Sequence, residues 1–234
     1  MFRSAQSSEG CRTCKASGFF CNLSTSAKSH FEEIKITSGY PKSSTLFREN
    51  EEARGIYVLC DGSAKITMSS SEGKTLILRI ALPGEILGLT EVLAGKTYGI
   101  TVETLHTSRV SFVRREDFLR FLAQHPEAYS NVARELSSHY HQACEQLRTV
   151  GLSSSISERL VRLFLDWSSA TPESVNGKKI KVPLTHEEIG EFIGTSRETV
   201  TRTLSDLKNR HLIVLQGATL TIPNPTALAS YAGI

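Results

Sequence analysis

The sequence predicts an α+β fold that runs from a small β-roll, through a long amphipathic helix, to a C-terminal winged helix-turn-helix. Three observations predict it: short strand-like runs between residues 43 and 113, an apolar repeat of three and four residues up to residue 150, and two capping motifs around a glycine near the C-terminus. We expect four segments, namely a cysteine-bearing segment (1–25), the roll (26–122), the long helix (123–150) and the winged helix-turn-helix (151–234).

Composition bounds the class of protein before any motif is considered. The chain has 234 residues, 39% hydrophobic and 22% charged, which is enough apolar material for a proper core. No apolar run is long enough to span a bilayer, and no apolar stretch follows the first arginine, so we expect a cytoplasmic protein without membrane contact. The net charge of +3 is too small to identify a nucleic-acid binder, so any claim of DNA binding depends on a motif.

The predicted roll is built from short strands joined by tight turns. Asp61-Gly62 and Glu72-Gly73 are typical hairpin turns, and apolar residues alternate with polar ones on both sides of the second turn. Hairpins at this spacing indicate a small barrel or roll. The predicted strands are Gly55–Cys60, Ser63–Met68, Thr75–Ile80 and Gly99–Thr104.

The long helix has a heptad-like apolar seam with charged residues between its members. One interpretation is that the seam packs on the roll of its own chain, and the other is that it forms a dimer interface through Leu136, Tyr140, Ala143 and Leu147. A hinge follows at residues 151–156. The full seam consists of Tyr129, Val132, Leu136, Tyr140, Ala143, Leu147 and Val150.

Two short helices joined by a tight turn are predicted near the C-terminus. Thr185 with Glu188 is a capping box that opens the first helix, and Gly194 ends it. Thr195 with Glu198 is interpreted as a second capping box that opens the next helix. Two short helices around a glycine-containing turn predict a helix-turn-helix.

The second of these helices separates an apolar face from a polar one. The apolar face carries Val200, Leu204 and Leu207, whereas the polar face presents groups that suit base edges and phosphates. Leu212–Leu215 and Thr219–Ile222 then predict a β-hairpin wing. The polar face consists of Ser196, Arg197, Glu198, Thr201 and Arg202.

Competing chemical interpretations are weaker. His186-Glu187-Glu188 begins like a zinc-protease motif, but position 190 is glycine, so the second histidine is missing. No nucleophile–base pair or phosphate loop stands out, and we therefore expect no enzyme activity.

The stretch SRETVTR, residues 196–202, resembles the recognition helix of the Crp/Fnr family of bacterial transcription regulators. Segments 61–63, 83–88 and 157–160 support the resemblance, which covers the chain from about residue 26 to its end. It implies a cyclic-nucleotide-binding-type roll, a dimerisation helix and a homodimer that binds a palindromic DNA operator, with RNA polymerase as a further partner.

Carried over to this chain, the resemblance makes Arg197, Glu198 and Arg202 the base readers. Arginine can bind guanine through two hydrogen bonds, and glutamate can accept one from cytosine N4. Ser196 and Thr199 would lie near phosphates, and Thr201 would belong to the same surface. For Arg202 the alternative is a contact to phosphate alone.

The sensor end departs from the cyclic-AMP-binding members of the family. Their glutamate after the Gly-Glu-x-x-Gly segment is replaced by Leu89, and their Arg-Ser pair aligns with Lys96-Thr97. Without the glutamate no acceptor remains for a ribose hydroxyl, and lysine replaces a bidentate clamp with a point charge. We therefore expect that cyclic AMP is not the signal, although another small ligand in the roll stays an alternative.

Cys11, Cys14 and Cys21 form a cluster that resembles the N-terminal cysteines of the oxygen-sensing Fnr branch. That resemblance implies a [4Fe–4S] cluster and redox sensing, but the position of the fourth cysteine aligns with Ser108. Cys60 is then either a substitute ligand or a small buried hydrophobe. Zinc, thiol redox chemistry and the absence of any metal are the alternatives.

Overall fold

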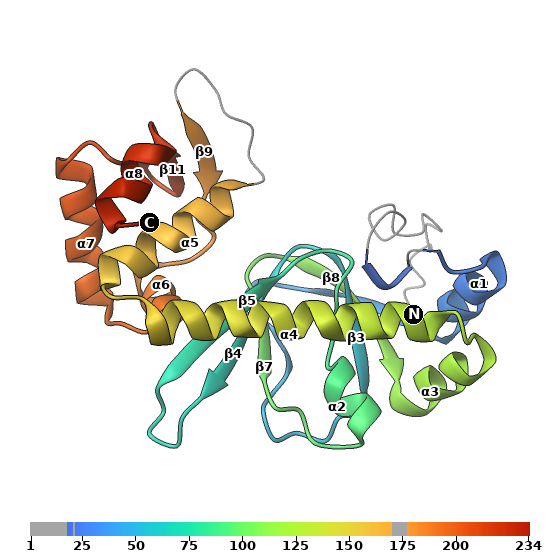
Figure 1. Ribbon diagram of the computed structural model, residues 1–234. Coiled ribbons are helices and arrows are strands. Elements are labelled where there is room, and N and C mark those ends of the chain that lie inside the picture. Colours follow the sequence, from blue (N-terminus) through green and yellow to red (C-terminus); the bar gives the residue numbers. More distant parts are fainter. Residues whose placement is uncertain (1–17, 21, 170–176) are drawn as a thin grey trace, which may run out of the picture. The chain divides into compact units, whose positions relative to one another are not determined.

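The structure is a computed structural model that describes residues 18–20, 22–169 and 177–234 (Figure 1). The chain divides into two compact units. The first comprises Met1–Ile66 and Ile80–Tyr140, and the second comprises Thr67–Arg79 and His141–Ile234. Within the described ranges, no helix is both long and apolar enough to cross a membrane.

Two four-stranded sheets make up the roll, which confirms the predicted architecture (Figure 1). The first sheet has the order β1-β8-β3-β6 and the second the order β2-β7-β4-β5, with β5 at an edge. Strand β3 is buried along almost its whole length because β8 and β6 flank it. The strands are β1 (Ile36–Tyr40), β2 (Thr45–Phe47), β3 (Gly55–Asp61), β4 (Ala64–Ser69), β5 (Thr75–Ala81), β6 (Ile86–Leu87), β7 (Thr101–Thr104) and β8 (Ser108–Arg114).

The four predicted strands are present as β3, β4, β5 and β7, but β7 begins two residues later than expected. Both predicted turns contain a glycine with positive φ, 91° at Gly62 and 79° at Gly73. Such angles are accessible to glycine at little cost, which explains why these residues mark the turns. Strands β1, β2 and β6 were not predicted, and β8 was expected only as the strand that the family resemblance places around Ser108.

Helices close one end of the first unit around an aromatic cluster. The phenylalanine rings of this cluster come from short helix η2 (Gly18–Phe20), α1 (Thr25–Ile34) and α3 (Arg115–Gln124). The remaining helix of this unit before α4 is α2 (Leu89–Ala94), which lies between β6 and β7 in the chain. Ser24 caps α1 by accepting a hydrogen bond from the backbone of Ala27. The buried rings are those of Phe19, Phe31, Phe118 and Phe121.

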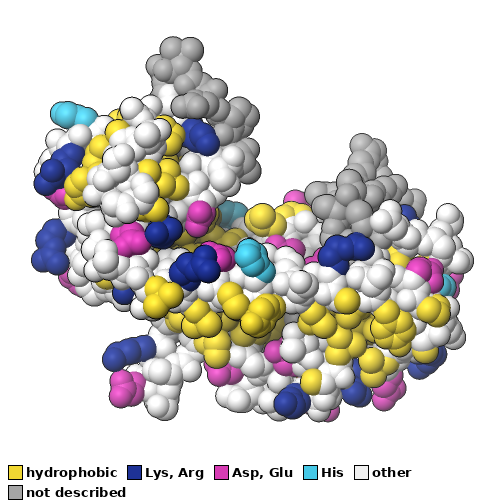
Figure 2. Space-filling model, viewed as in Figure 1, with side chains coloured by type: hydrophobic (Ala, Val, Ile, Leu, Met, Phe, Trp, Pro, Cys, Tyr) yellow, Lys and Arg dark blue, Asp and Glu magenta, His cyan; other side chains and the backbone are white. Residues whose placement is uncertain are grey.

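Helix α4 (Ala128–Leu152) is continuous and leaves most of its apolar seam exposed. Val132 is buried, but Tyr140 and Leu147 are 73% and 70% exposed, and Ala143 is exposed too. Figure 2 shows hydrophobic side chains following this helix on the face toward the viewer. The predicted hinge is shorter than expected, because the helix runs through Leu152 and only residues 153–155 separate it from the next helix.

The second unit contains the predicted winged helix-turn-helix. Helices α5 (Ile156–Ser169), α6 (His186–Ile193) and α7 (Arg197–Asn209) accompany a sheet of order β10-β11-β9. The wing is the hairpin of β10 (Val214–Gln216) and β11 (Thr219–Ile222), which pairs Gln216 with Thr219 across a two-residue turn. Strand β9 (Lys178–Lys181) and helix α8 (Pro225–Ala232) complete the unit and were not predicted.

Candidate nucleic-acid interface

Helix α6 begins and ends where the sequence predicts. The Thr185 hydroxyl accepts a hydrogen bond from the backbone N–H of Glu188 at 3.2 Å, and the Thr185 N–H donates to the Glu188 carboxylate at 2.9 Å. These two bonds are the predicted capping box. Gly194 ends the helix with φ 69° and ψ 46°, a left-handed conformation that favours glycine.

The second predicted capping box is wrong. Helix α7 is capped by Ser196, whose hydroxyl accepts from the backbone N–H of Thr199 at 3.3 Å, and not by Thr195. The extended backbone of Ser196 places Arg197 and Glu198 in the first turn of the helix. Glu198 therefore does not form a capping box with Thr195, and its side chain is exposed.

Hydrogen bonds at the start of α7 favour the charged form of Glu198. A hydrogen bond to its own backbone N–H, followed by one to the Ser196 side chain, lowers the pKa of the Glu198 carboxyl. The group is therefore an anion at neutral pH and a hydrogen-bond acceptor.

The two helices meet closely at one glycine. A Cβ placed on Gly190 would lie 2.7 Å from the backbone oxygen of Thr195, which is closer than real contacts allow. The apolar faces of α6 and α7 are buried in the core of the helix-turn-helix. This packing holds α7 so that its polar face is directed to solvent. The buried residues are Ile189, Ile193, Val200, Leu204 and Leu207.

Five of the six predicted DNA-binding residues form one exposed surface on α7. Ser196, Arg197, Glu198, Thr201 and Arg202 are exposed. Thr199 is half-buried, and its hydroxyl lies 3.1 Å from that of Ser196.

The two arginines of this surface are available for a ligand. Neither Arg197 nor Arg202 forms an ion pair with any residue that the structure describes, whereas Arg210 is held 3.0 Å from Asp206 and stacks over the Tyr231 ring. Arginines without an internal ion pair on an exposed helix face can reach base edges or phosphates.

Sequence reasoning missed one residue of this surface. His186 opens α6, and its Nδ1 lies 3.0 Å from the Thr201 hydroxyl on α7. Its only sequence signal was an incomplete zinc-protease motif, which says nothing about a contact fifteen residues away. His186 therefore orients the Thr201 hydroxyl, which belongs to the exposed polar face of α7.

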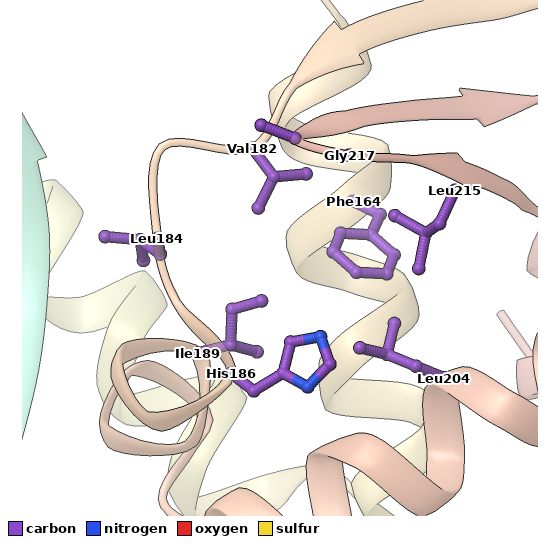
Figure 3. A pocket seen from close by; sticks show the side chains of 9 residues that line it. Phe164, Val182, Leu184, His186, Ile189, Leu204, Leu215 and Gly217 are labelled. Atoms are coloured by element: carbon purple, nitrogen blue, oxygen red, sulfur yellow. The ribbon is translucent and has the colours of Figure 1, made fainter.

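A cavity of about 280 Å³ lies beside the recognition helix within the winged domain (Figure 3). Its walls are mostly apolar and come from α5, α6, α7, the wing and the segment before α6, with the His186 ring projecting into it. The lining residues are Phe164, Val182, Leu184, His186, Ile189, Leu204, Leu215, Gly217 and Ala218.

The residues aligned with the cyclic-AMP-binding positions of the family differ in their exposure to solvent. Leu89 is 1% exposed at the start of α2 and offers no polar atom, whereas Lys96 and Thr97 are exposed. The residue that replaces the ribose-binding glutamate is therefore part of the roll core.

The predicted metal ligands are only partly visible. Cys11, Cys14 and Cys21 lie outside the described residues. Cys60 is buried, with its Sγ 3.2 Å from the Ser111 hydroxyl and 3.6 Å from the backbone oxygen of Val58. In the part of the chain that the structure describes, no three His, Cys, Asp or Glu side chains gather to hold a metal.

Comparisons with known proteins find the same two domains. Residues 38–125 match the cyclic nucleotide-binding domain and residues 158–231 match the Crp-like helix-turn-helix domain. The transcriptional activatory protein AadR of Rhodopseudomonas palustris is 28% identical over 187 residues, which are 79% of this chain and 76% of that protein. The cAMP-activated global transcriptional regulator CRP of Pasteurella multocida is 23% identical over 184 residues, 78% of this chain and 88% of that protein.

Solved structures agree on the fold. FixK2 from Bradyrhizobium japonicum superposes with a TM-score of 0.73 at 20% identity, over 84% of this chain and 96% of that one. The c-di-GMP-responsive regulator CLP from Xanthomonas campestris gives a TM-score of 0.75 at 20% identity, over 86% of this chain and all of that one.

Proposed function

We propose that this chain, a transcription regulator of the Crp/Fnr type, acts in the cytoplasm as a homodimer that binds a palindromic operator, with RNA polymerase as a further partner. The observation that carries the proposal is the exposed face of α7, where two arginines without an internal ion pair flank an ionised glutamate.

The proposed contacts follow from the chemistry of these side chains. Arg197 and Arg202 can donate pairs of hydrogen bonds to guanine, and the Glu198 carboxylate can accept one from cytosine N4. Ser196 and Thr199 lie at the N-terminus of α7, where N–H groups and the helix dipole favour a phosphate. Thr201 lies between the two arginines on the same face, held by His186.

The direct test is binding to a palindromic duplex with family-like TGTGA or TTGAT half-sites. We expect a shifted band for this duplex in a gel-shift assay at physiological salt, and much weaker binding to a scrambled duplex of equal length. Equal affinity for both duplexes would remove the sequence-specific part of the proposal.

The homodimer is proposed because α4 carries an uncovered apolar seam. Tyr140 and Leu147 are each at least 70% exposed, and Ala143 and the half-buried Leu136 lie between and beside them. Exposed apolar residues at heptad spacing are buried when two such helices pair. We propose that a second copy of α4 covers Leu136, Tyr140, Ala143 and Leu147.

We also propose that the N-terminal cysteines hold a [4Fe–4S] cluster that makes operator binding sensitive to oxygen. The support is the donor set, since thiolates of Cys11, Cys14 and Cys21 suit iron–sulfur ligation. Cys60 fits less well as the fourth ligand, because its sulfur is enclosed between β3 and the Ser111 hydroxyl of β8. When bound, such a cluster would supply an oxygen-labile centre.

Purification without oxygen tests this proposal. We expect brown protein that contains iron and sulfide, and Cys14→Ser should remove the colour because a hydroxyl is a poor ligand for iron. Cys60→Ser tests the fourth position separately: retention of a full cluster would assign that position to another residue. Colourless, iron-free wild-type protein would leave zinc or thiol chemistry for these cysteines.

A small ligand of the roll is the second candidate signal, because residues 38–125 match the cyclic nucleotide-binding domain. The buried Leu89 removes the acceptor for a ribose hydroxyl, so cyclic AMP is a poor candidate. Isothermal titration with cyclic AMP should give no heat of binding. Saturable binding at micromolar concentrations would favour this second signal instead.

A further inference from the structure

One buried glutamine of α4 contacts two distant backbone segments. The Gln146 side chain is 6% exposed, and its Nε2 donates to the backbone oxygen of Ile77 at 2.9 Å and to that of Phe192 at 2.6 Å. Ile77 belongs to β5, and Phe192 belongs to α6 of the helix-turn-helix. All three residues lie in the second compact unit.

The acceptor on α6 is a carbonyl that the helix itself leaves without a partner. Phe192 lies in the last turn of α6, and the last four carbonyls of a helix have no N–H within that helix to accept from. The next carbonyl, that of Ile193, accepts from Arg159 Nη1 of α5 at 3.2 Å. Side chains from α4 and α5 therefore cap the end of α6 from outside.

The other acceptor is the backbone oxygen of Ile77 in strand β5. Strand β5 is the edge of its sheet, so one side of its backbone has no neighbouring strand. The Gln146 amide takes the place of that missing strand at Ile77. One NH₂ group therefore satisfies both a sheet edge and a helix end.

We infer that Gln146 is a positioning residue, which holds α6 against the β4–β5 hairpin so that the recognition helix α7 is placed by the state of the hairpin. The inference rests on the proposed operator binding and adds a route of regulation to it. An amide nitrogen has two hydrogens, and both are used here. Loss of this group removes the side-chain donor from the buried carbonyl of Ile77 and from the half-buried carbonyl of Phe192 at once, which couples the two segments.

The position of α6 affects α7 through the close contact between the two helices. The Thr195 N–H donates to the Gly190 backbone oxygen at 2.8 Å, and Gly190 has no room for a Cβ beside the Thr195 oxygen, so the end of α6 lies directly against the start of α7. A shift of the Phe192 carbonyl is therefore transmitted to the surface that contains Arg197 and Arg202.

The test compares Gln146→Met, which keeps the length and removes both donors, with Gln124→Met, the same change at an exposed glutamine of α3. Hydrogen exchange followed by mass spectrometry reports the β4–β5 hairpin and the α6–α7 turn, and a gel shift reports operator affinity. We expect about tenfold faster exchange in both segments and about tenfold weaker operator binding, the scale of a lost buried hydrogen bond. Gln124→Met should leave all three values unchanged.

The outcomes separate this inference from the proposed function. Faster exchange in only one segment, or in neither, would overturn the coupling, as would wild-type operator affinity in a variant with two loosened segments. A wild type that binds no operator would contradict the proposed function, while the exchange data would still decide whether Gln146 joins the two segments. If Gln146→Met does not fold, Gln146→Asn keeps the amide but shortens its reach, and the same outcomes apply.

Discussion

Arg197 and Arg202 are both exposed on α7, but they lie at different points of the helix. Arg197 is its first residue and Arg202 lies more than one turn later, so the two guanidinium groups reach different parts of a bound duplex. Whether each arginine contacts a base or a phosphate is therefore tested by substituting each one separately.

Arg197→Ala should cost about 1–3 kcal/mol of operator binding and relax specificity at one base pair, because a bidentate base contact is lost. Competition gel shifts with single-base operator variants measure both effects. The matched variant Arg202→Ala tests the alternative of a phosphate contact, which predicts uniform weakening and a smaller salt dependence. If Arg197→Ala weakens binding to specific and random DNA equally, Arg197 contacts only phosphate.

Glu158 makes the start of α5 sensitive to acid. Its carboxylate accepts hydrogen bonds from the Ser154 hydroxyl at 2.8 Å and the Ser154 N–H at 2.7 Å, and pairs with Arg162 at 3.0 Å. These contacts lower the pKa of the Glu158 carboxyl below its ordinary value of 4.5, with the Ser154 hydroxyl as the largest cause. Because the charged form is favoured in the folded state, the stabilisation is present above pH 4.5 and is lost as the pH falls below that value.

Thermal unfolding between pH 3 and 7 tests this prediction. We expect Glu158→Gln to lower the melting temperature at pH 7 and to reduce its dependence on acid. Glu145→Gln, at an exposed position of α4, is the control and should retain the wild-type dependence. An identical pH profile for Glu158→Gln and the wild type would contradict the role given to Glu158.

At the scale of secondary-structure elements, the exposed seam of α4 is the surface that we propose a second copy of the chain covers. Ala143→Glu should convert the protein to a monomer and abolish operator binding, because two carboxylates would face each other across a two-fold axis. Sedimentation velocity measures the change in mass. Ser137→Glu places the same charge about 120° around the helix and should leave the dimer intact. A dimeric Ala143→Glu would show that another surface holds the protomers together.

The helix-turn-helix was predictable because its signals are local. Thr185, Glu188 and Gly194 encode the start and end of α6 within ten residues, so no long-range contact was needed. The cap of α7 was misplaced by one residue because Thr195 and Ser196 are both good capping residues, and only the backbone angles distinguish them.

Strand β8 illustrates what local signals miss in the roll. Ser108 and Ser111 are buried there, and the Ser111 hydroxyl lies 2.7 Å from that of Thr37 on β1. Because buried serines break the apolar pattern, periodicity alone does not identify this strand, which only the family resemblance placed around Ser108. The bonds of His186 and Gln146 were equally hidden, since their partners are fifteen or more residues away in the sequence.

At the scale of the whole molecule, a two-fold dimer requires two recognition helices to enter the major groove on one side of the DNA. Half-site centres about 34–36 Å apart, one helical turn, satisfy this requirement. Insertion of about 5 base pairs between the half-sites should therefore reduce affinity to that of a single half-site, because the second site rotates to the opposite side. Gel shifts with the lengthened duplex measure the loss, and unchanged affinity would mean that one protomer binds alone.

The contact at Gly190 has a consequence for inheritance. A side chain at this position would force α6 and α7 apart, but it leaves the seam of α4 untouched. In a cell that carries both alleles, a Gly190→Val subunit should still pair with a normal one, and the mixed dimer would have a single working recognition helix. At equal expression and random pairing, about three quarters of all dimers would contain at least one defective subunit. The variant should therefore be dominant over the wild-type allele, whereas a variant that cannot dimerise, such as Ala143→Glu, should be recessive.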